Sequence, residues 1–427
     1  MKTENGTKLF NFMVLIYPLL DIIYSLDSII LKINLPINQF VRFLFMIYLL
    51  RFVKKKSYVV IIILFSLLTL GEITFAYQGN LNLFGDISYI TKLLFFVITV
   101  YGIEGMLEEK IITPIKLLTL IVNSSYIICA SVILSKFGFG FNSWGENSLR
   151  SGVKGLFTVQ NTVTATLLII LPICLLLYRE TKNSRYILNF CLIFLSLSFL
   201  GTKSGLAGAV VISLVQLIYL FIKTKTTYLK MAITFFLALG IICLVYLSLG
   251  YIKSFVNTQE AIYNQFGYVN IYSFILSNRD LQVLALQRYI NGLSNINPVF
   301  TFGLGYSLSN EVIHAFKPDF QAIEMDFYGI YYYSGIWVLV LFVIVIAKKY
   351  FNSIFNLFKS KFSFYSLSIF VGLTIGIFHA FYGGHVVYEA LTILYFCSLL
   401  SISRFEYKKQ KLKLEENQGN EKDKVLV

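Results

Sequence analysis

One stretch of the chain, residues 251–326, gathers side chains that can hold an anion or move a proton. It lies between strongly apolar segments, and five of its residues carry this chemistry: Arg279, Arg288, His314, Glu324 and Asp326. Arginine binds phosphate and carboxylate groups through paired N–H donors. Histidine and carboxylate groups can take a proton from a hydroxyl group. We therefore expect this stretch to be an insert that carries a reaction.

Arg279 is the leading candidate for binding an anion. It follows Asn278, a suitable N-cap, at the start of a helix predicted over residues 279–293. A cation beside the free N–H groups of a helix N-terminus makes a good anion site. A snorkelling interfacial arginine is the alternative interpretation. Arg288 lies nine residues later, about 900° around the helix and so on the opposite face, where it would meet lipid headgroups.

Three residues of the insert can accept a proton. Glu324 and Asp326 lie two positions apart, so on a helix their side chains diverge by about 200°. One of them can face a cavity while the other caps the helix N-terminus, and capping is the expected role of Asp326 in particular. Glu324 is the leading general base, His314 is the reserve, and Asp326 remains a further catalytic candidate.

No metal site or cofactor is predicted. His314, His379 and His385 include no pair at the i, i+4 spacing that is typical of metal ligands on a helix. The five cysteines lie in apolar runs, which favours small buried hydrophobic residues. The Gly-Leu-Gly of residues 303–305 is too sparse for a nucleotide-binding loop.

The composition places these residues in a membrane protein. The 427 residues are 57% hydrophobic and only 14% charged, with a mean hydropathy of +0.73. A soluble domain of this size would expose far more apolar surface than water tolerates. We predict an all-α polytopic bundle of about twelve spans, near residues 9–26, 38–53, 57–77, 86–104, 114–136, 156–178, 186–202, 204–222, 231–251, 327–347, 362–380 and 385–403.

The positive charges orient this bundle. The net charge of +14 by itself would also suggest a nucleic-acid partner. However, the basic clusters follow only even-numbered spans, as the positive-inside rule requires when both termini are cytoplasmic. The clusters are Lys54–Lys56; Arg179, Lys182 and Arg185; Lys223, Lys225 and Lys230; Lys348, Lys349, Lys359 and Lys361; and Arg404, Lys408, Lys409, Lys411 and Lys413. No nucleic-acid partner is therefore expected, and the long insert is predicted to lie outside.

The domain organisation follows from this topology. Residues 1–403 form one transmembrane bundle, residues 251–326 an external catalytic loop between spans nine and ten, and residues 404–427 a cytoplasmic polar tail, predicted to be disordered from about Glu406. Four charges fall in the outer halves of their spans: Asp21, Arg42, Glu72 and Lys92. They either pair, for instance Asp21 with Arg42 or Glu72 with Lys92, or line a polar cavity that opens outward.

Three passages, in order, resemble the signature of the O-antigen ligase/polymerase superfamily. The first is Gly-Val-Lys-Gly-Leu-Phe at residues 152–157, running to Asn161, and the second is Leu-Gly-Thr-Lys-Ser-Gly at residues 200–205. The third comprises Ser-Asn-Arg at 277–279, Pro298, Gly-Leu-Gly at 303–305, Glu-Met-Asp at 324–326 and Tyr-Ser-Gly-Ile at 333–336. The likeness spans about residues 150–345 together with the twelve-span layout.

The resemblance implies a GT-C-like glycosyltransferase of the bacterial cytoplasmic membrane. Such enzymes act at the outer face on undecaprenyl-diphosphate-linked glycans, here with Arg279 stabilising the diphosphate and Glu324 as the base. Further candidates for the diphosphate are Lys203, Arg150, Lys154 and Arg288. The chain departs from the family pattern in having Lys203 where arginine is usual, so a forked phosphate contact becomes a point charge.

A second departure bears on the kind of transfer. The ligases of the family carry a histidine just before the re-entering span, where this chain has Glu324 and Asp326. Acidic residues there resemble the polymerase branch, including capsule and exopolysaccharide polymerases. A ligase, a glycolipid flippase and a non-enzymatic assembly factor are the alternatives. For a polymerase, flippase and chain-length regulator proteins are further possible partners.

Overall fold

The computed structural model describes residues 2–32, 37–77, 82–143, 152–223, 273, 276–318 and 322–425. Its helices are α1 (Lys2–Leu26), the π-helix η1 (Asp27–Leu31), α2 (Ile37–Leu50), α3 (Lys55–Tyr77), α4 (Leu83–Glu108), α5 (Pro114–Lys136), α6 (Gln160–Thr181), α7 (Arg185–Leu200), α8 (Lys203–Lys223), α11 (Arg279–Asn291), α12 (Asn297–Phe302), α13 (Tyr306–Phe316), α14 (Asp326–Lys359), α15 (Phe364–Tyr382) and α16 (Ala390–Val425). The strands β1 (Phe141–Asn142) and β2 (Val153–Gly155) form a small antiparallel hairpin.

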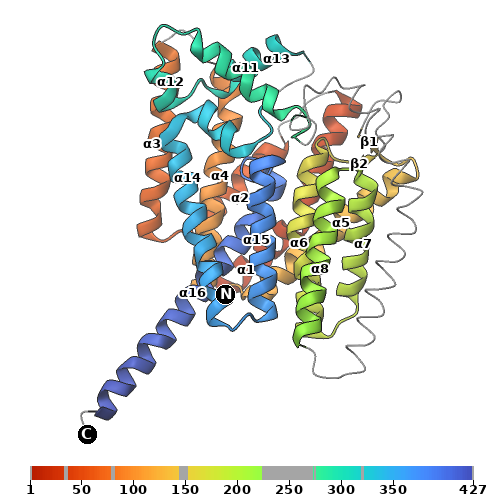
Figure 1. Cartoon of the computed structure of the whole chain (residues 1–427), viewed down its shortest axis with the longest axis vertical. Coiled ribbons are helices and arrows are strands. Elements are labelled where there is room, and N and C mark those ends of the chain that lie inside the picture. Colours follow the sequence, from red (N-terminus) through yellow and green to blue (C-terminus); the bar gives the residue numbers. More distant parts are fainter. Residues whose placement is uncertain are drawn as a thin grey trace.

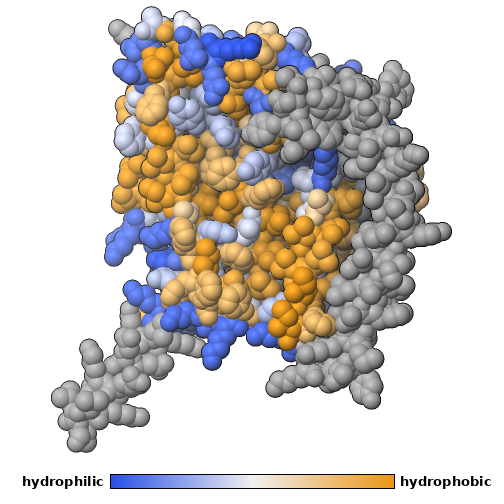
Figure 2. Space-filling model, in the orientation of Figure 1, coloured by the Kyte–Doolittle hydropathy of each residue, from blue (hydrophilic) through white to orange (hydrophobic). Residues whose placement is uncertain are grey.

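The structure confirms the all-α polytopic fold. Within the part of the chain that it describes, eight helices are long and apolar enough to cross a membrane: α1, α3, α4, α5, α6, α8, α14 and α15. The apolar helices α2 and α7 are shorter, and α16 carries no charge between Ala390 and Ser403. The predicted ninth span, residues 231–251, lies outside the described residues, so the count of twelve stays a prediction. Figure 2 shows a broad band of hydrophobic residues across this face of the bundle, with hydrophilic residues above and below it.

Short helices cover one end of the bundle. Figure 1 shows α11, α12 and α13 together at the end opposite the C-terminus. They belong to the predicted external loop, of which residues 251–272, 274–275 and 319–321 lie outside the described residues. The predicted helix over residues 279–293 is therefore found as α11, two residues shorter than expected at its C-terminal end.

A break inside α14 anchors these short helices to the membrane bundle. Gly335 has φ 79° and ψ −180°, which interrupts the helix. The carbonyl oxygens of Tyr332 and Tyr333 accept hydrogen bonds from the N–H groups of Leu304 (2.7 Å) and Gly305 (3.1 Å). The Gly-Leu-Gly turn that follows α12 is therefore docked on the break in α14, which fixes α12 and α13 above the span.

Of the four charges predicted to lie in the outer halves of their spans, three form ion pairs, although not all as expected. Arg42 contacts Asp21 at 2.6 Å, as predicted. Lys92 pairs with Glu389 at 3.0 Å rather than with Glu72, because α4 packs against the start of α16. Glu389 falls inside the predicted span 385–403 and lies just before α16 begins, and sequence spacing gave no sign of its contact with a residue almost 300 positions earlier.

The C-terminal tail corrects a further expectation. Residues 404–425 continue α16 as helix to Val425, where we predicted no regular structure. The segment is rich in lysine, glutamate, glutamine and leucine, which favour helix, and it contains no proline that would end a helix already started in the bundle.

Candidate functional site

The two leading sequence candidates form one ion pair. The Nε and Nη2 atoms of Arg279 lie 2.7 and 2.6 Å from Oε2 of Glu324. Arg279 begins α11 after two residues with left-handed backbone, Ser277 and Asn278, and its Nη1 atom donates to the carbonyl of Leu276 at 3.2 Å. Asn278 holds the N-cap position, but its side chain forms no capping hydrogen bond with the described residues. The guanidinium is therefore held by Glu324 and by the chain before the helix.

Two further side chains approach the same carboxylate oxygen. Nδ2 of Asn161, in the first turn of α6, donates to Oε2 of Glu324 at 3.2 Å, and Nε2 of His385 lies 3.9 Å from this atom. The backbone N–H of Glu324 is held by Oε1 of Gln282 at 3.1 Å. The Glu324 side chain is 36% exposed and that of Arg279 13%, so the pair can be reached from solvent.

Asp326 is used differently from the prediction. It is fully buried, and its carboxylate forms no capping hydrogen bond on α14 within the described structure. Oδ1 accepts from the N–H of His385, and Oδ2 from those of Val386 and Val387, each at 2.7 Å. A carboxylate that accepts three backbone hydrogen bonds fixes the turn between α15 and α16. Asp326 thereby positions the His385 side chain.

A glycine lets this turn approach Glu324. Gly384 has φ +68°, and a side chain on it would overlap the carbonyl oxygen of Glu324. The carbonyl of Gly384 also lies 2.9 Å from Nδ1 of His379 at the end of α15. Residues 383–387 therefore close over the start of α14. The pair of glycines before His385 was the one sign in the sequence that its backbone meets another segment closely.

The charges of the site reinforce one another. Burial would raise the pKa of Glu324, but the Arg279 guanidinium, with its hydrogen bonds, and the nearby His385 lower this pKa to about 2. Burial opposes the charged form of His385, yet the Glu324 carboxylate raises its pKa above the ordinary 6.5, with Glu389 and Asp326 contributing. The Glu324 carboxylate therefore lies between the Arg279 cation and an imidazole whose protonated form it stabilises.

Two of the other predicted cations lie around the first turn of α6. Lys154 on β2 donates from Nζ to the carbonyl of Thr158 at 3.2 Å, and burial lowers its pKa. Gly152 packs on the carbonyl of Leu200, and Thr202 contacts Thr164 of α6 at 3.1 Å, just before the exposed Lys203. The hairpin and the turn between α7 and α8 thus border the end of α6 that carries Asn161.

The remaining predicted residues are placed apart or not described. The guanidinium of Arg288 lies 5.5 Å from the ring centre of Phe316 on α13, as expected for a residue on the other face of α11. His314 is exposed on α13. Arg150 lies outside the described residues. Asn161, Gln282 and His385 were not among the predicted site residues, since their approach to Glu324 depends on tertiary packing.

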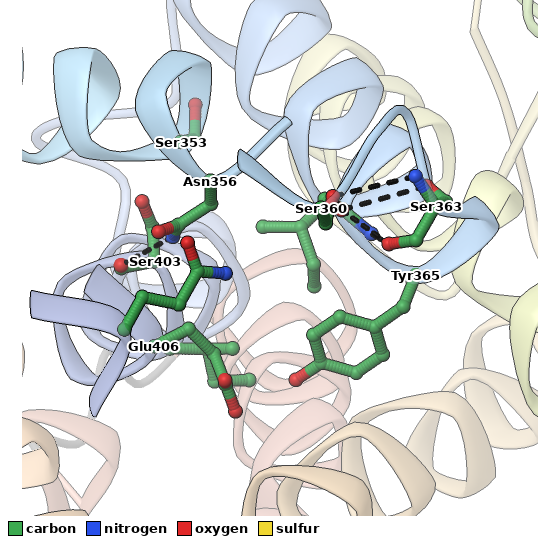
Figure 3. A pocket seen from close by; sticks show the side chains of 11 residues that line it. Ser353, Asn356, Ser360, Ser363, Tyr365, Ser403 and Glu406 are labelled. Atoms are coloured by element: carbon green, nitrogen blue, oxygen red, sulfur yellow. Dashed lines mark hydrogen bonds between the residues drawn. The ribbon is translucent and has the colours of Figure 1, made fainter. Parts of the chain in front are cut away.

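A polar cavity at the opposite end of the bundle does not contain these residues. It measures about 200 Å³ and lies between the end of α14, the start of α15 and the middle of α16 (Figure 3). Its lining includes Ser353, Asn356, Tyr365 and Glu406. Among the described residues, no group of three or more His, Cys, Asp or Glu is placed to hold a metal ion.

Comparison with known proteins agrees with this architecture. A family model described as O-antigen ligase like membrane protein matches residues 3–269, well over half of the 427 residues. The match includes Asn161, Lys154 and Lys203 and ends before Arg279. No curated protein matches the chain. The length of the family match shows that the chain belongs to the O-antigen ligase-like family of membrane proteins.

Proposed function

We propose that this protein is a glycosyltransferase that polymerises undecaprenyl-diphosphate-linked oligosaccharide repeat units into surface polysaccharide. The reaction takes place at the outer face of the bacterial cytoplasmic membrane, with both termini in the cytoplasm. The observation that carries the proposal is the Arg279–Glu324 pair, reachable from solvent and contacted by Asn161, in a chain of this family. An arginine and a carboxylate are the two groups that transfer from a lipid diphosphate needs.

The reaction is a displacement at the anomeric carbon of the donor sugar. The acceptor hydroxyl oxygen forms the new bond to this carbon while the bond to the diphosphate oxygen breaks, with inversion expected. The diphosphate leaves with the electron pair, and Arg279 stabilises its growing charge. Lys154 and Lys203 assist near α6, and Arg150 is a further candidate for the diphosphate. Glu324 accepts the hydroxyl proton, with His314 in reserve. All of these groups belong to the chain itself.

An enzyme assay tests this function. Purified full-chain protein is incubated with lipid-linked repeat units, and the products are separated on a gel. A ladder of lengths is the expected result. A single transfer to a distinct acceptor would instead show a ligase, the alternative function. No bond formation would contradict both and favour a flippase.

Replacing the base gives a sharper test within that assay. Glu324→Gln removes the proton acceptor, and we expect polymer formation to fall by roughly 10²–10⁴-fold while the protein stays in the membrane. Glu311→Gln is the matched control, because Glu311 is exposed on α13 of the same external region. Near-normal chain length with Glu324→Gln would exclude Glu324 as the base.

A further inference from the structure

Four nitrogen atoms from three segments converge on one oxygen atom. Oε2 of Glu324 lies 2.7 and 2.6 Å from Nε and Nη2 of Arg279, 3.2 Å from Nδ2 of Asn161 and 3.9 Å from Nε2 of His385. These donors come from α11, from the first turn of α6 and from the turn between α15 and α16. Such a convergence of donors is the pattern of an anion-binding site. Its occupant in this structure is a carboxylate oxygen of the protein itself.

This occupant can leave without unfolding the site. The donors are held by contacts of their own: Arg279 also bonds to the carbonyl of Leu276, and Asp326 fixes the backbone of His385. The backbone of Glu324 is fixed by Gln282, but its side chain is 36% exposed. Rotation about the Glu324 side-chain bonds can therefore empty the site while its donors stay in place.

We propose that Glu324 is a place-holder for a phosphate group of the donor: the diphosphate displaces its carboxylate from Arg279, Asn161 and His385, and the released carboxylate then accepts the proton of the acceptor hydroxyl. This inference rests on the proposed function and adds an order to it. The donor must bind before the base becomes active. His385 and Asn161 become diphosphate-binding residues, and Asp326 becomes a positioning residue.

Electrostatics favours the exchange of the Glu324 carboxylate for a phosphate group. Replacing one anion by another does not leave the largely covered Arg279 guanidinium uncompensated, which would be costly. In the closed pair Glu324 has a pKa of about 2 and attracts a proton weakly. Loss of the Arg279 and His385 contacts removes the groups that lower this pKa, so its proton affinity rises only once a donor is bound.

Binding measurements distinguish the place-holder from a fixed ion pair that braces α11 against α14. Full-chain protein in detergent is titrated with inorganic diphosphate and, separately, with undecaprenyl diphosphate. Glu324→Gln weakens the internal competitor, so both ligands should bind about 10-fold more tightly or better, within the range typical of coupled sites. Arg279→Gln should abolish this gain in the double variant, and Glu311→Gln should bind like the unmodified protein.

Each outcome of these measurements either supports or contradicts the place-holder role of Glu324. Binding to Glu324→Gln that is unchanged or weaker would overturn the proposal. Tighter binding of inorganic diphosphate alone would show a free-anion site and overturn the assignment to the lipid-linked donor. If Glu324→Gln fails to fold, the unmodified protein still gives an answer. Inorganic diphosphate should then speed carbodiimide labelling of Glu324, measured by mass spectrometry, whereas an unchanged rate would contradict its release.

These tests also separate this inference from the polymerase proposal, because they measure binding and need no product. Tighter binding without a product ladder would leave the anion site standing and remove the polymerase. A ladder from the unmodified protein together with unchanged binding by Glu324→Gln would support the polymerase and contradict the place-holder role of Glu324.

Discussion

Arg279 uses both edges of its guanidinium group. Nε and Nη2 contact Glu324, while Nη1 holds the carbonyl of Leu276. A lysine can supply the charge but not this fork. We expect Arg279→Lys to slow polymer formation by roughly 10- to 150-fold, the equivalent of one lost charge-assisted hydrogen bond of about 1.5–3 kcal/mol.

Arg288→Lys is the matched control for this substitution. It lies on the same helix, with its guanidinium over the ring of Phe316, and should have a smaller effect in the same gel assay. An unimpaired Arg279→Lys variant would return Arg279 to the interpretation of a snorkelling interfacial charge.

The contact between His385 and Glu324 should depend on pH in a defined window. The pKa of His385 is raised above 6.5, so its contribution to stability is complete below pH 6.5 and is lost as pH rises through the raised value. The pKa of Glu324 is lowered from 4.5 to about 2, so its contribution is complete above pH 4.5 and is lost toward pH 2. The two contributions are therefore present together between about pH 4.5 and 6.5.

The test compares melting temperatures of the unmodified protein and His385→Gln across pH. The charged groups that raise the pKa of His385 are Glu324, Glu389 and Asp326, and His385 itself acts on the neighbouring His379. The stability difference between the two proteins should be largest between pH 4.5 and 6.5 and should shrink above that window. A difference that does not change with pH would mean that His385 contributes packing alone.

At the scale of elements, the break at Gly335 determines where α12 and α13 lie. Its φ of +79° costs an L-residue roughly 1–3 kcal/mol, and an added side chain would overlap the carbonyl of Thr301. We expect Gly335→Ala to lower the melting temperature and to reduce activity by shifting the Gly-Leu-Gly turn. Gly71→Ala, in the interior of α3 with ordinary space around it, is the control that should be tolerated. Equal melting temperatures for both variants would contradict this role.

The sequence predicted the elements better than their contacts. Residues 114–136 were expected as a span and form α5 within the same bounds, because a long apolar run and Pro114 mark the helix directly. For α14 the prediction ended at residue 347, before Lys348 and Lys349, but the helix continues to Lys359. Lys349 is buried against Glu104 of α4, so it does not mark the membrane–water interface at which the span was predicted to end.

The site was predicted only in part for the same reason. Arg279 and Glu324 were singled out by residue type and by family order, yet their contact spans 45 positions. Asn161 lies 163 positions before Glu324, and His385 meets it through a turn that Asp326 and Gly384 shape. No periodic pattern in a sequence reports such contacts, since they arise when separate helices pack.

At the scale of the whole molecule, the proposal requires a particular sidedness. The helices α11–α13 lie at one end of the bundle, and the turn between α14 and α15, which includes Lys361, lies at the other (Figure 1). We expect a membrane-impermeant maleimide to label His314→Cys in intact cells and Lys361→Cys only after permeabilisation. Both positions are exposed.

The native cysteines set the background of this experiment. Cys129, Cys174 and Cys397 are buried and Cys191 is exposed on α7, while Cys243 lies outside the described residues, so labelling of the parent protein must be subtracted. The reversed labelling pattern would place Arg279 and Glu324 on the cytoplasmic side. The basic clusters would then lie outside, against the positive-inside rule. The proposal of polymerisation at the outer face would then be contradicted too, because Arg279 and Glu324 could not meet a donor presented there.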